Sequence, residues 1–364
     1  MSGKVGVGII GSGFVADIHA NAFRRCGDCE IIAVASPTLN HVKAFALKHG
    51  VKQYFTDYRE LFKLDTVEVV SVGAPNYLHA KICMEAAEAG KHIIMEKPFA
   101  MNLKEADQMI SACRRYGVKL MYAEELCFAP KYLRAKELID EGAIGKLYMI
   151  KQSEKHFGPH SDWFWNVEKS GGGVFMDMGC HALCFFYWTI NRRKPKSIYC
   201  HFSREIHPDK TMGEDNSIAL VEFEGGVIGL AEDSWAKRGG MDDKAEFYGS
   251  EGVIYADLLM GSSLLVYSEK GYGYAVEKAP TTKGWTYCVP DELWQYGFPQ
   301  EMAHFIECVK YDKKPLVTGE DGRVVIELIM AGYHSAALGR KAYLPFTMDA
   351  DKPIDLWFKW REQQ

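Results

Sequence analysis

Apolar positions in the first ~125 residues form two alternating kinds of segment. Short runs that are apolar throughout alternate with longer stretches in which apolar residues recur every three or four positions. The predicted strands are KVGVGII (4–10), 30–36, 67–75, 91–95 and 119–123. The predicted helices are 17–26, 40–50, 77–90 and 103–117, the second opened by Asn40 and closed by Gly50. This alternation predicts a parallel sheet covered by helices on both faces.

The pattern changes after a helical stretch at 128–145, where the predicted strands follow one another. They are 146–156, 195–203, 216–226, 227–233, 245–252, 253–258 and 263–269. Several alternate apolar and polar residues, as expected for a half-exposed antiparallel sheet. Helices are predicted at 180–191, 300–312 and 321–340. We therefore predict an α/β protein of two domains, 1–124 and 125–364, the second with a large, mostly antiparallel open sheet.

Composition and charge narrow the class of protein. The 364 residues are 48% hydrophobic and 25% charged, with a net charge of −5. No basic stripe suggests nucleic acid, and no apolar run approaches the ~20 residues that span a bilayer. The chain enters a strand at once, without a signal-peptide pattern, so its ten cysteines favour a reducing cytoplasm over disulfides. One CxxC, Cys26 to Cys29, has no second ligand pair, so no metal is expected.

The first predicted turn carries a dinucleotide fingerprint. Gly11-Ser12-Gly13-Phe14-Val15-Ala16 fits G-x-G-x-x-G/A, follows a strand and opens a helix in a βαβ unit. Its glycines permit a tight turn and close backbone approach, so a pyrophosphate can sit on the helix N-terminus. We predict a Rossmann dinucleotide-binding domain in which Gly11, Ser12, Gly13, Phe14 and Val15 contact the cofactor.

The choice between NAD and NADP depends on the end of the second strand. An acid there binds the NAD ribose and an arginine accommodates the NADP phosphate. This chain has Ser36-Pro37-Thr38, so neither rule applies. We take Ser36 as a cofactor contact and favour NAD, with NADP left open.

Glu96, Lys97 and Pro98 end a buried strand, at the edge where parallel sheets bind ligands. Oxidising a secondary alcohol removes a hydride from carbon and a proton from oxygen, and the proton acceptor needs a pKa near the working pH. Lysine in water, with a pKa of ~10.4, is too basic unless burial or a neighbouring cation lowers it. A second proton-handling group is therefore expected.

The segment SGGGVFMDMGCHALCFF supplies that group. Asp177 and His181 are four residues apart, so on a helix they share a face. Gly171 to Gly173 would let the backbone approach a ligand closely. We predict His181 as general base, Asp177 as its orienter or a substrate ligand, and Lys97 as a proton-relay partner. Cys180 and Cys184 are interpreted as buried thiols.

Three segments resemble the signatures of the Gfo/Idh/MocA oxidoreductases: GIIGSGFVADIHANAF, APNYLHAKICMEAAEAGKHIIMEKP and GGGVFMDMGCHALCF. The resemblance covers nearly the whole chain and implies an NAD(P)-dependent sugar or polyol dehydrogenase. It maps Lys97, Asp177 and His181 onto the catalytic trio, and Asn76, His79 and Glu96 near the cofactor. It also implies a second-domain sheet that packs against another subunit, hence a homo-oligomer (a dimer or tetramer).

Two departures from the family pattern concern the site. The acid after the second strand is absent, and the usual Asn-Arg before the interdomain Phe-x-Pro is replaced by Glu125-Leu126-Cys127 ahead of Phe128. Glu125 therefore falls close to the expected active site and is a candidate substrate contact.

The segment EKHFGPHSDWFWNVEKSGGG is rich in aromatic residues and histidine. Flat aromatic faces pack against sugar rings while polar neighbours bind hydroxyls, so His156, His160, Trp163 and Trp165 are substrate candidates. The alternative is a loop that its aromatics hold to the core. No Arg or Lys cluster stands out here, which favours a neutral sugar, glycoside or polyol.

Three functions remain open. The first is oxidation of a ring secondary alcohol, such as C3 of a glucoside, with inositol 2-dehydrogenase as runner-up. The second is an NAD-dependent glycosidase that oxidises the sugar transiently. The third is a cofactor-binding sensor, which would not need Lys97, Asp177 and His181.

Overall fold

The computed structural model describes residues 3–260 and 264–361 of the chain. Its backbone divides into two compact units. The first runs to Glu125 and takes in Gly297–Ile326, and the second comprises Leu126–Tyr296 and the chain from Glu327 onward. Among the described residues no helix is both long and apolar enough to cross a membrane.

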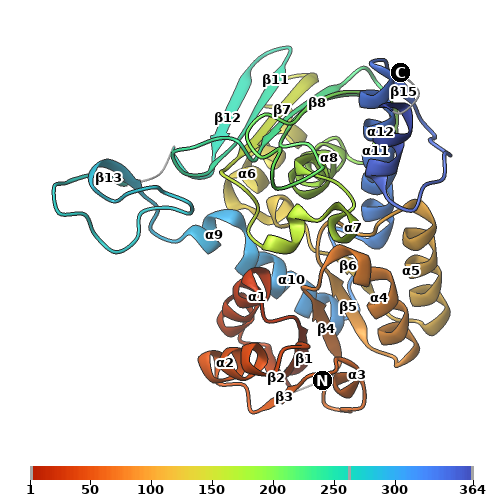
Figure 1. Cartoon of the computed structure of the whole chain (residues 1–364), viewed down its shortest axis with the longest axis vertical. Helices are drawn as coiled ribbons and strands as arrows, with labels where there is room; N and C mark the ends of the chain where they lie inside the picture. Colours follow the sequence, from red (N-terminus) through yellow and green to blue (C-terminus); the bar gives the residue numbers. More distant parts are fainter. Residues whose placement is uncertain (1–2, 261–263, 362–364) are drawn as a thin grey trace. The chain divides into compact units, whose positions relative to one another are not determined.

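A six-stranded parallel sheet forms the centre of the first unit (Figure 1). Its strands are β1 (Val5–Ile10), β2 (Cys29–Ala35), β3 (Gln53–Phe55), β4 (Val69–Val72), β5 (His92–Met95) and β6 (Leu120–Tyr122). They lie in the order β3-β2-β1-β4-β5-β6, and all adjacent pairs are parallel. Every residue of β1 is buried, as its unbroken apolar run predicts. The predicted Rossmann-type sheet is confirmed.

Helices connect these strands. They are α1 (Phe14–Arg25), α2 (Leu39–His49), α3 (Arg59–Phe62), α4 (His79–Glu88) and α5 (Leu103–Tyr116). Gly50 ends α2 in the left-handed conformation, as predicted, but Thr38 rather than Asn40 precedes the helix. The side chain of Asn102 caps α5 by accepting a hydrogen bond from the Glu105 amide.

Residues 297–326 belong to the first unit, although the sequence-based division placed them in the second domain. Helix α10 (Phe298–Lys310) packs on α1, and Lys310 Nζ lies 2.6 Å from Asp28 Oδ1. Because these partners are almost three hundred residues apart in the chain, local sequence patterns do not reveal that the chain returns to the first unit. The predicted boundary near residue 124 itself stays a prediction.

The second unit is built on a seven-stranded sheet in the order β12-β11-β7-β10-β9-β8-β15. Its strands are β7 (Leu147–Lys155), β8 (Pro195–Ser203), β9 (Asn216–Phe223), β10 (Ile228–Ser234), β11 (Asp242–Gly249), β12 (Val253–Asp257) and β15 (Ala342–Tyr343). Only the β7–β10 pair in this order is parallel, so the predicted mostly antiparallel sheet is confirmed.

Helices α8 and α11 pack on one face of this sheet. The second unit contains α6 (Pro130–Asp140), α7 (Val167–Ser170), α8 (Cys180–Thr189), α9 (Glu292–Tyr296), α12 (Pro353–Arg361) and the part of α11 (Gly319–Leu338) from Glu327 onward. Phe185 of α8 packs against Phe247 of β11, and Ser335 of α11 accepts a hydrogen bond from the Cys200 amide of β8. Along β9 the buried residues Ala219 and Val221 alternate with more exposed ones, so the opposite face is open.

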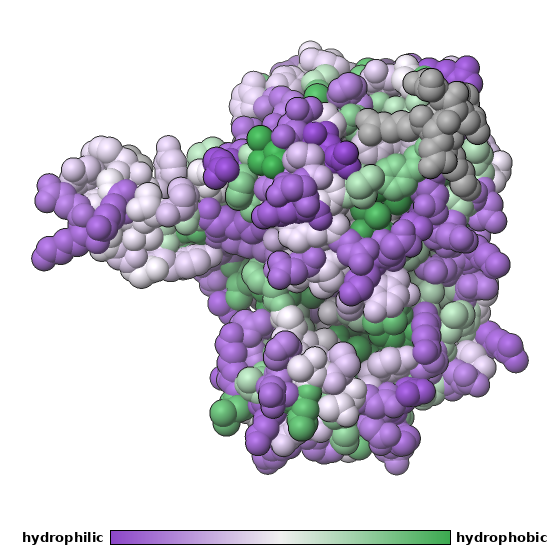
Figure 2. All heavy atoms as spheres, viewed as in Figure 1, coloured by the Kyte–Doolittle hydropathy of each residue, from purple (hydrophilic) through white to green (hydrophobic). Residues whose placement is uncertain are grey.

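A two-stranded arm and the helix α12 complete the second unit. The arm (264–288) consists of β13 (Leu264–Ser268), β14 (Gly284–Cys288) and the segment between them, and it extends from the rest of its unit in Figure 1. Its surface is mostly of low hydropathy (Figure 2). The predicted strand 263–269 corresponds to β13, except that Ser263 lies outside the described residues. No strand was predicted at β14.

Candidate functional site

The glycine-rich fingerprint loop of the first unit joins β1 to α1. Gly11 has a φ of +119°, and a Cβ atom there would lie 2.6 Å from the Gly73 carbonyl oxygen, so only glycine fits. Gly13 precedes α1, and a Cβ atom there would meet nothing within 4 Å. No side chain caps the helix at Gly13, which leaves its N-terminal amides as donors. The loop thus has the open, positively polarised cradle that a pyrophosphate requires.

Ser12 and Ser36 are brought together by the fold. The Ser12 hydroxyl donates a hydrogen bond to the Ser36 hydroxyl over 2.8 Å, which joins the fingerprint to the end of β2. Phe14 is exposed at the first turn of α1, and Val15 is half-buried behind it. The predicted contacts therefore surround one loop, although their part in cofactor binding stays a prediction.

Two buried histidines hold the loop that carries Lys97. His19 of α1 lies between the Ser71 hydroxyl, 2.7 Å from its Nδ1 atom, and Glu96 Oε1, 2.8 Å from its Nε2 atom. Glu96 in turn accepts a hydrogen bond from the Lys97 amide over 3.0 Å. Lys97 is half-buried, and its bond to Pro98 is cis. His19 was not singled out from the sequence, where it looks like an ordinary helix residue.

His79 is the second of these histidines. Its Nε2 atom lies 2.8 Å from the Ala74 carbonyl oxygen and its Nδ1 atom 3.0 Å from that of Pro98, so the ring links the loops after β4 and β5. Burial lowers the pKa of His79, although the two carbonyl groups and Glu96 oppose that shift. Asn76, in the 3-10 turn Asn76–Leu78 before α4, is also buried.

Four buried glutamates accompany this edge of the first unit. Glu96 follows β5, Glu124 and Glu125 follow β6, and Glu301 lies on α10. Burial and the charges of Glu125, Glu96 and Glu124 raise the pKa of Glu301 well above its usual value. Glu125, a predicted substrate contact, is thus buried within an acidic group of its own unit.

In the second unit, Asp177 lies in a π-helical turn, Phe175–Gly179, that runs directly into α8. Its Oδ2 atom accepts a hydrogen bond of 3.1 Å from the indole nitrogen of Trp235, and both residues are buried. Such π-helical turns are rare in proteins, and those that occur frequently lie at functional sites. Trp235 follows β10 directly and was missed, because an isolated tryptophan after a strand is no site signal.

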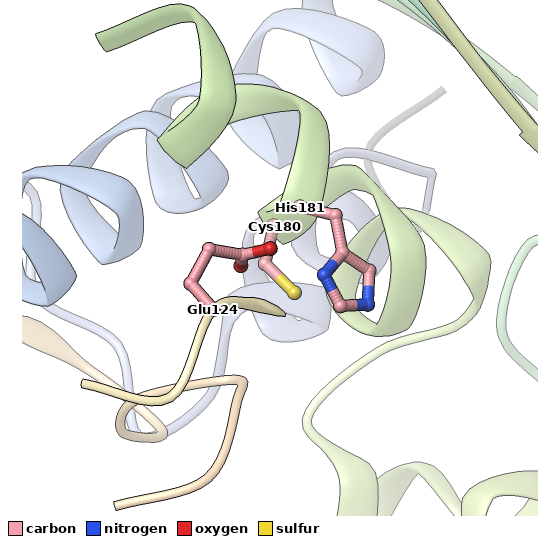
Figure 3. A group of neighbouring side chains, drawn as sticks. All are labelled: Glu124, Cys180 and His181. Atoms are coloured by element: carbon pink, nitrogen blue, oxygen red, sulfur yellow. The ribbon is translucent and has the colours of Figure 1, made fainter. Parts of the chain in front are cut away.

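His181 lies in the first turn of α8, as predicted, and its side chain leaves the helix beside that of Cys180 (Figure 3). Both are buried, and Cys184 is buried too, which confirms the interpretation of the two cysteines as buried thiols. The prediction that Asp177 and His181 share a face assumed a regular α-helix. Because the wider π turn precedes α8, that shared face stays a prediction.

Two of the three glycines pack closely against other parts of the second unit, and the predicted approach of a ligand to this segment stays a prediction. A Cβ atom on Gly172 would lie 1.9 Å from the Tyr333 hydroxyl oxygen, and one on Gly173 would lie 2.0 Å from the Glu214 carbonyl oxygen. The carboxylate of Glu214 accepts hydrogen bonds from the Phe175 amide (2.9 Å) and the Tyr333 hydroxyl (2.6 Å). Burial raises the pKa of Glu214 to about 7. This buried network fixes the backbone just before Asp177.

The predicted aromatic loop packs beside Trp235. Trp165 meets Trp235 edge-on with ring centroids 5.4 Å apart, and Trp163 stacks on Phe164 at 3.9 Å. Trp163 and Trp165 are half-buried, so each has one part in the packing and one part accessible. The two interpretations left open from the sequence, a sugar-binding wall and a loop held to the core, are therefore compatible.

His156 and His160 lie together in this loop, with ring centroids 4.7 Å apart. The arm supplies partners for both: Glu277 contacts His160 Nε2, and Lys278 Nζ lies 3.3 Å from His156 Nδ1. Burial lowers the pKa of His156 well below its usual value, and His160 and Lys278 add to the effect. Glu277 and Lys278 were missed, because they stand in a stretch without periodicity or motif.

The predicted site residues are thus gathered in two sets. The first unit brings together Gly11, Ser12, Gly13, Ser36, Asn76, His79, Glu96 and Lys97. The second unit holds Asp177, His181 and the aromatic loop with His156 and His160. Each set belongs to one unit, and the catalytic roles of Lys97, Asp177 and His181 stay predictions.

A family model described as "Oxidoreductase family, NAD-binding Rossmann fold" matches residues 5–124, and one described as "GFO/IDH/MocA C-terminal domain" matches residues 132–255. Together these matches cover most of the chain.

Individual relatives agree with the family models. D-glucoside 3-dehydrogenase of Escherichia coli is 30% identical over 250 residues, which are 65% of this chain and 71% of the relative. Myo-inositol 2-dehydrogenase of Thermotoga maritima is 25% identical over 327 residues, 88% of this chain and 93% of the relative. The solved structure of GenD2 from gentamicin A biosynthesis in complex with NAD has a TM-score of 0.89 at 28% identity, covering 96% of this chain and 98% of that one.

Proposed function

Because the chain belongs to the Gfo/Idh/MocA oxidoreductase family and is an NAD-dependent enzyme, we propose that it oxidises a ring secondary alcohol of a sugar or glycoside to a ketone, with C3 of a glucoside as the favoured position. The observation that carries the proposal is the setting of Asp177. A buried carboxylate held by Trp235, beside half-buried indole rings and two histidines, suits a ligand with both hydroxyl groups and flat apolar faces.

The residues of the first unit fit NAD. Gly13 leaves open space at an uncapped helix N-terminus, and the Ser12–Ser36 pair lies at the end of β2. We propose that Gly11, Ser12, Gly13, Phe14 and Val15 hold the pyrophosphate, with Ser36 near the ribose and Asn76, His79, Glu96 and Lys97 toward the nicotinamide. Serine replaces the usual ribose-binding acid, so NAD is favoured and NADP is the alternative to be measured.

In the proposed mechanism, NAD held by the first unit would supply the acceptor for the hydride that leaves the alcohol carbon. His181 accepts the proton of the alcohol oxygen as general base. Asp177, fixed by the Trp235 indole, orients His181 or binds a neighbouring substrate hydroxyl. Lys97 donates a hydrogen bond that favours the alkoxide and relays the proton onward. The carbonyl product and one proton complete the balance.

The experiment is a substrate screen with matched variants. The purified protein is analysed for retained cofactor, then assayed with glucosides, free sugars and inositols by NADH absorbance and product identification. We expect Lys97→Met and His181→Asn to lower kcat/KM by about 10²–10⁴-fold on the best substrate, the range for lost acid–base groups. The exposed Lys52→Met and His41→Asn serve as controls and should retain full activity. Full turnover by both site variants would contradict the mechanism.

The same screen separates the alternatives. An inositol dehydrogenase, suggested by the relative from Thermotoga maritima, would form NADH with inositols and not with glucosides. An NAD-dependent glycosidase would release the aglycone without net NADH. A sensor would bind NAD and turn over none of these compounds.

We further propose that the enzyme is a homo-oligomer, a dimer or tetramer, that works in the cytoplasm. The open face of the second-unit sheet supports the first proposal, since it exposes Tyr199 and Ile218. Ten free cysteines support a reducing compartment.

A further inference from the structure

One lysine of the arm, Lys278, contacts the predicted aromatic loop, which carries His156 and His160. Lys278 Nζ lies 3.3 Å from His156 Nδ1 and 3.5 Å from the Phe157 carbonyl oxygen, and it also contacts the Gly158 carbonyl oxygen. An ammonium group has three donors and no acceptor. These three contacts therefore use all its donors.

The contact with His156 has a consequence for the imidazole ring. Since the ammonium group only donates, the Nδ1 atom of His156 must accept, and the ring proton then resides on Nε2. A ring in this state is neutral. His156 is 1% exposed, so a neutral imidazole also avoids the cost of a buried charge.

The neighbouring residue of the arm completes the connection. Glu277 contacts His160 Nε2, and the His160 ring stands edge-on to that of His156. The Glu277 amide donates to Glu292 Oε1 over 3.3 Å, which ties this segment to α9. Lys278 itself has a φ of +53°, a conformation uncommon outside glycine. Two adjacent arm residues thus contact the two histidines of the predicted aromatic loop.

We propose that Lys278 is a positioning residue of the proposed substrate site around Asp177. Its ammonium group holds His156 as the Nε2–H tautomer, so that His156 offers a substrate hydroxyl a hydrogen-bond donor and no positive charge. The part concerning the substrate rests on the proposed function. The part concerning the tautomer does not.

The charged groups around His156 set the expected pH dependence. His160 in its own loop and Lys278 on the arm disfavour protonation of His156, whereas Asp177 in the π turn and the Gly158 carbonyl group favour it. Glu277 lies behind His160, and Glu292 lies behind Glu277. Removing the lysine charge should therefore raise the pKa of His156 toward its ordinary ~6.5.

The first measurement is made without substrate. Nitrogen NMR of the histidine rings in the full-length protein, with the His156 signals assigned from a His156→Gln variant, reports the tautomer between pH 6 and 8. We expect an unprotonated Nδ1 and a protonated Nε2 in the wild type. A proton on Nδ1 would overturn the proposal, whether or not any substrate has been found.

The second measurement is the pH profile of kcat/KM. In Lys278→Met, kcat/KM at pH 5.5 relative to its value at pH 8 should be lower than in the wild type, because loss of the lysine charge raises the pKa of His156 while burial and His160 still hold it below its ordinary value. Lys278→Arg keeps the charge and should restore the wild-type profile. Lys283→Met, an exposed lysine of the same arm, should leave it unchanged.

The outcomes separate this proposal from the proposed function. An unaltered pH profile in Lys278→Met, with full activity at both pH values, would overturn the role of Lys278. Absence of turnover by the wild type on every sugar and polyol would instead overturn the proposed function, while the NMR tautomer would still decide the first part. If Lys278→Met fails to fold, Lys278→Arg and the wild-type NMR remain decisive.

Discussion

The two glycines of the fingerprint loop, Gly11 and Gly13, differ in what a side chain added at each position would meet. At Gly11 a Cβ atom would strike the Gly73 carbonyl group, and the left-handed backbone adds to the strain. At Gly13 the backbone is extended and the space is open. Gly11 is therefore required by the fold, whereas Gly13 is required only if a ligand approaches. This difference allows ligand binding to be tested without disturbing the fold.

Gly13→Ala should fold normally but bind NAD at least tenfold more weakly, because the added methyl group enters the space assigned to the pyrophosphate. The measurement is the NAD-dependent rise in thermal stability, which for a ligand at about 100 Kd corresponds to about 2.7 kcal/mol. Gly27→Ala, whose Cβ atom also meets nothing within 4 Å, is the matched control. Equal stabilisation of both variants by NAD would contradict the assigned cradle.

At the scale of elements, the helix α12 belongs to its own unit. Ile354, Leu356 and Trp357 are buried, and the Ile354 amide donates to the Gly171 carbonyl oxygen over 3.0 Å. Trp357 packs edge-on against Phe202 of β8. The helix therefore supports the loop that leads to Asp177.

Trp357→Ala should lower the free energy of unfolding by about 3–5 kcal/mol, the usual cost of truncating a large buried aromatic side chain. Urea denaturation of the second unit checks this value. Met348→Ala, at an exposed side chain nearby in the sequence, should change it by less than about 0.5 kcal/mol. A small loss for Trp357→Ala would mean that α12 contributes little to its unit.

Elements are also the scale at which sequence patterns succeed most. The long apolar strands and amphipathic helices of the first unit are found where predicted, because each is specified by local periodicity. The short strand β3, the strand β14 and the π turn before α8 were missed. The two strands depend on pairing with a neighbouring strand, and the π turn depends on a local widening of the helix. Neither produces a repeated pattern in the sequence.

At the scale of the whole molecule, the open face of the second-unit sheet is the feature on which the proposed homo-oligomer rests. Ile218 is 51% exposed on β9, and half-buried Leu220 lies two residues further on the same face. Single exposed apolar residues are common, but the exposed Tyr199 of β8 pairs with Leu220 across the sheet, so three apolar side chains lie near one another on this face. A second copy of the chain is the partner that we propose.

Ile218→Glu should weaken self-association by at least about tenfold, because a carboxylate would be buried twice in a symmetric interface. Light scattering over a dilution series measures the oligomeric state. Leu47→Glu, at an even more exposed leucine of α2 in the first unit, is the control and should leave association unchanged. A wild type that stays monomeric at high concentration would contradict the proposal.

The sequence by itself determined the parallel sheet of the first unit, the fingerprint loop and the candidates Lys97, Asp177 and His181, because these depend on periodicity and on spacing between near neighbours. Only the tertiary structure revealed His19 beside Glu96, the hydrogen bond from Trp235 to Asp177, the close packing of Gly172 and Gly173, and the contact between Lys278 and His156. In each case the partners are distant in the chain. Burial and hydrogen bonding between such partners are set by packing, which no local pattern encodes.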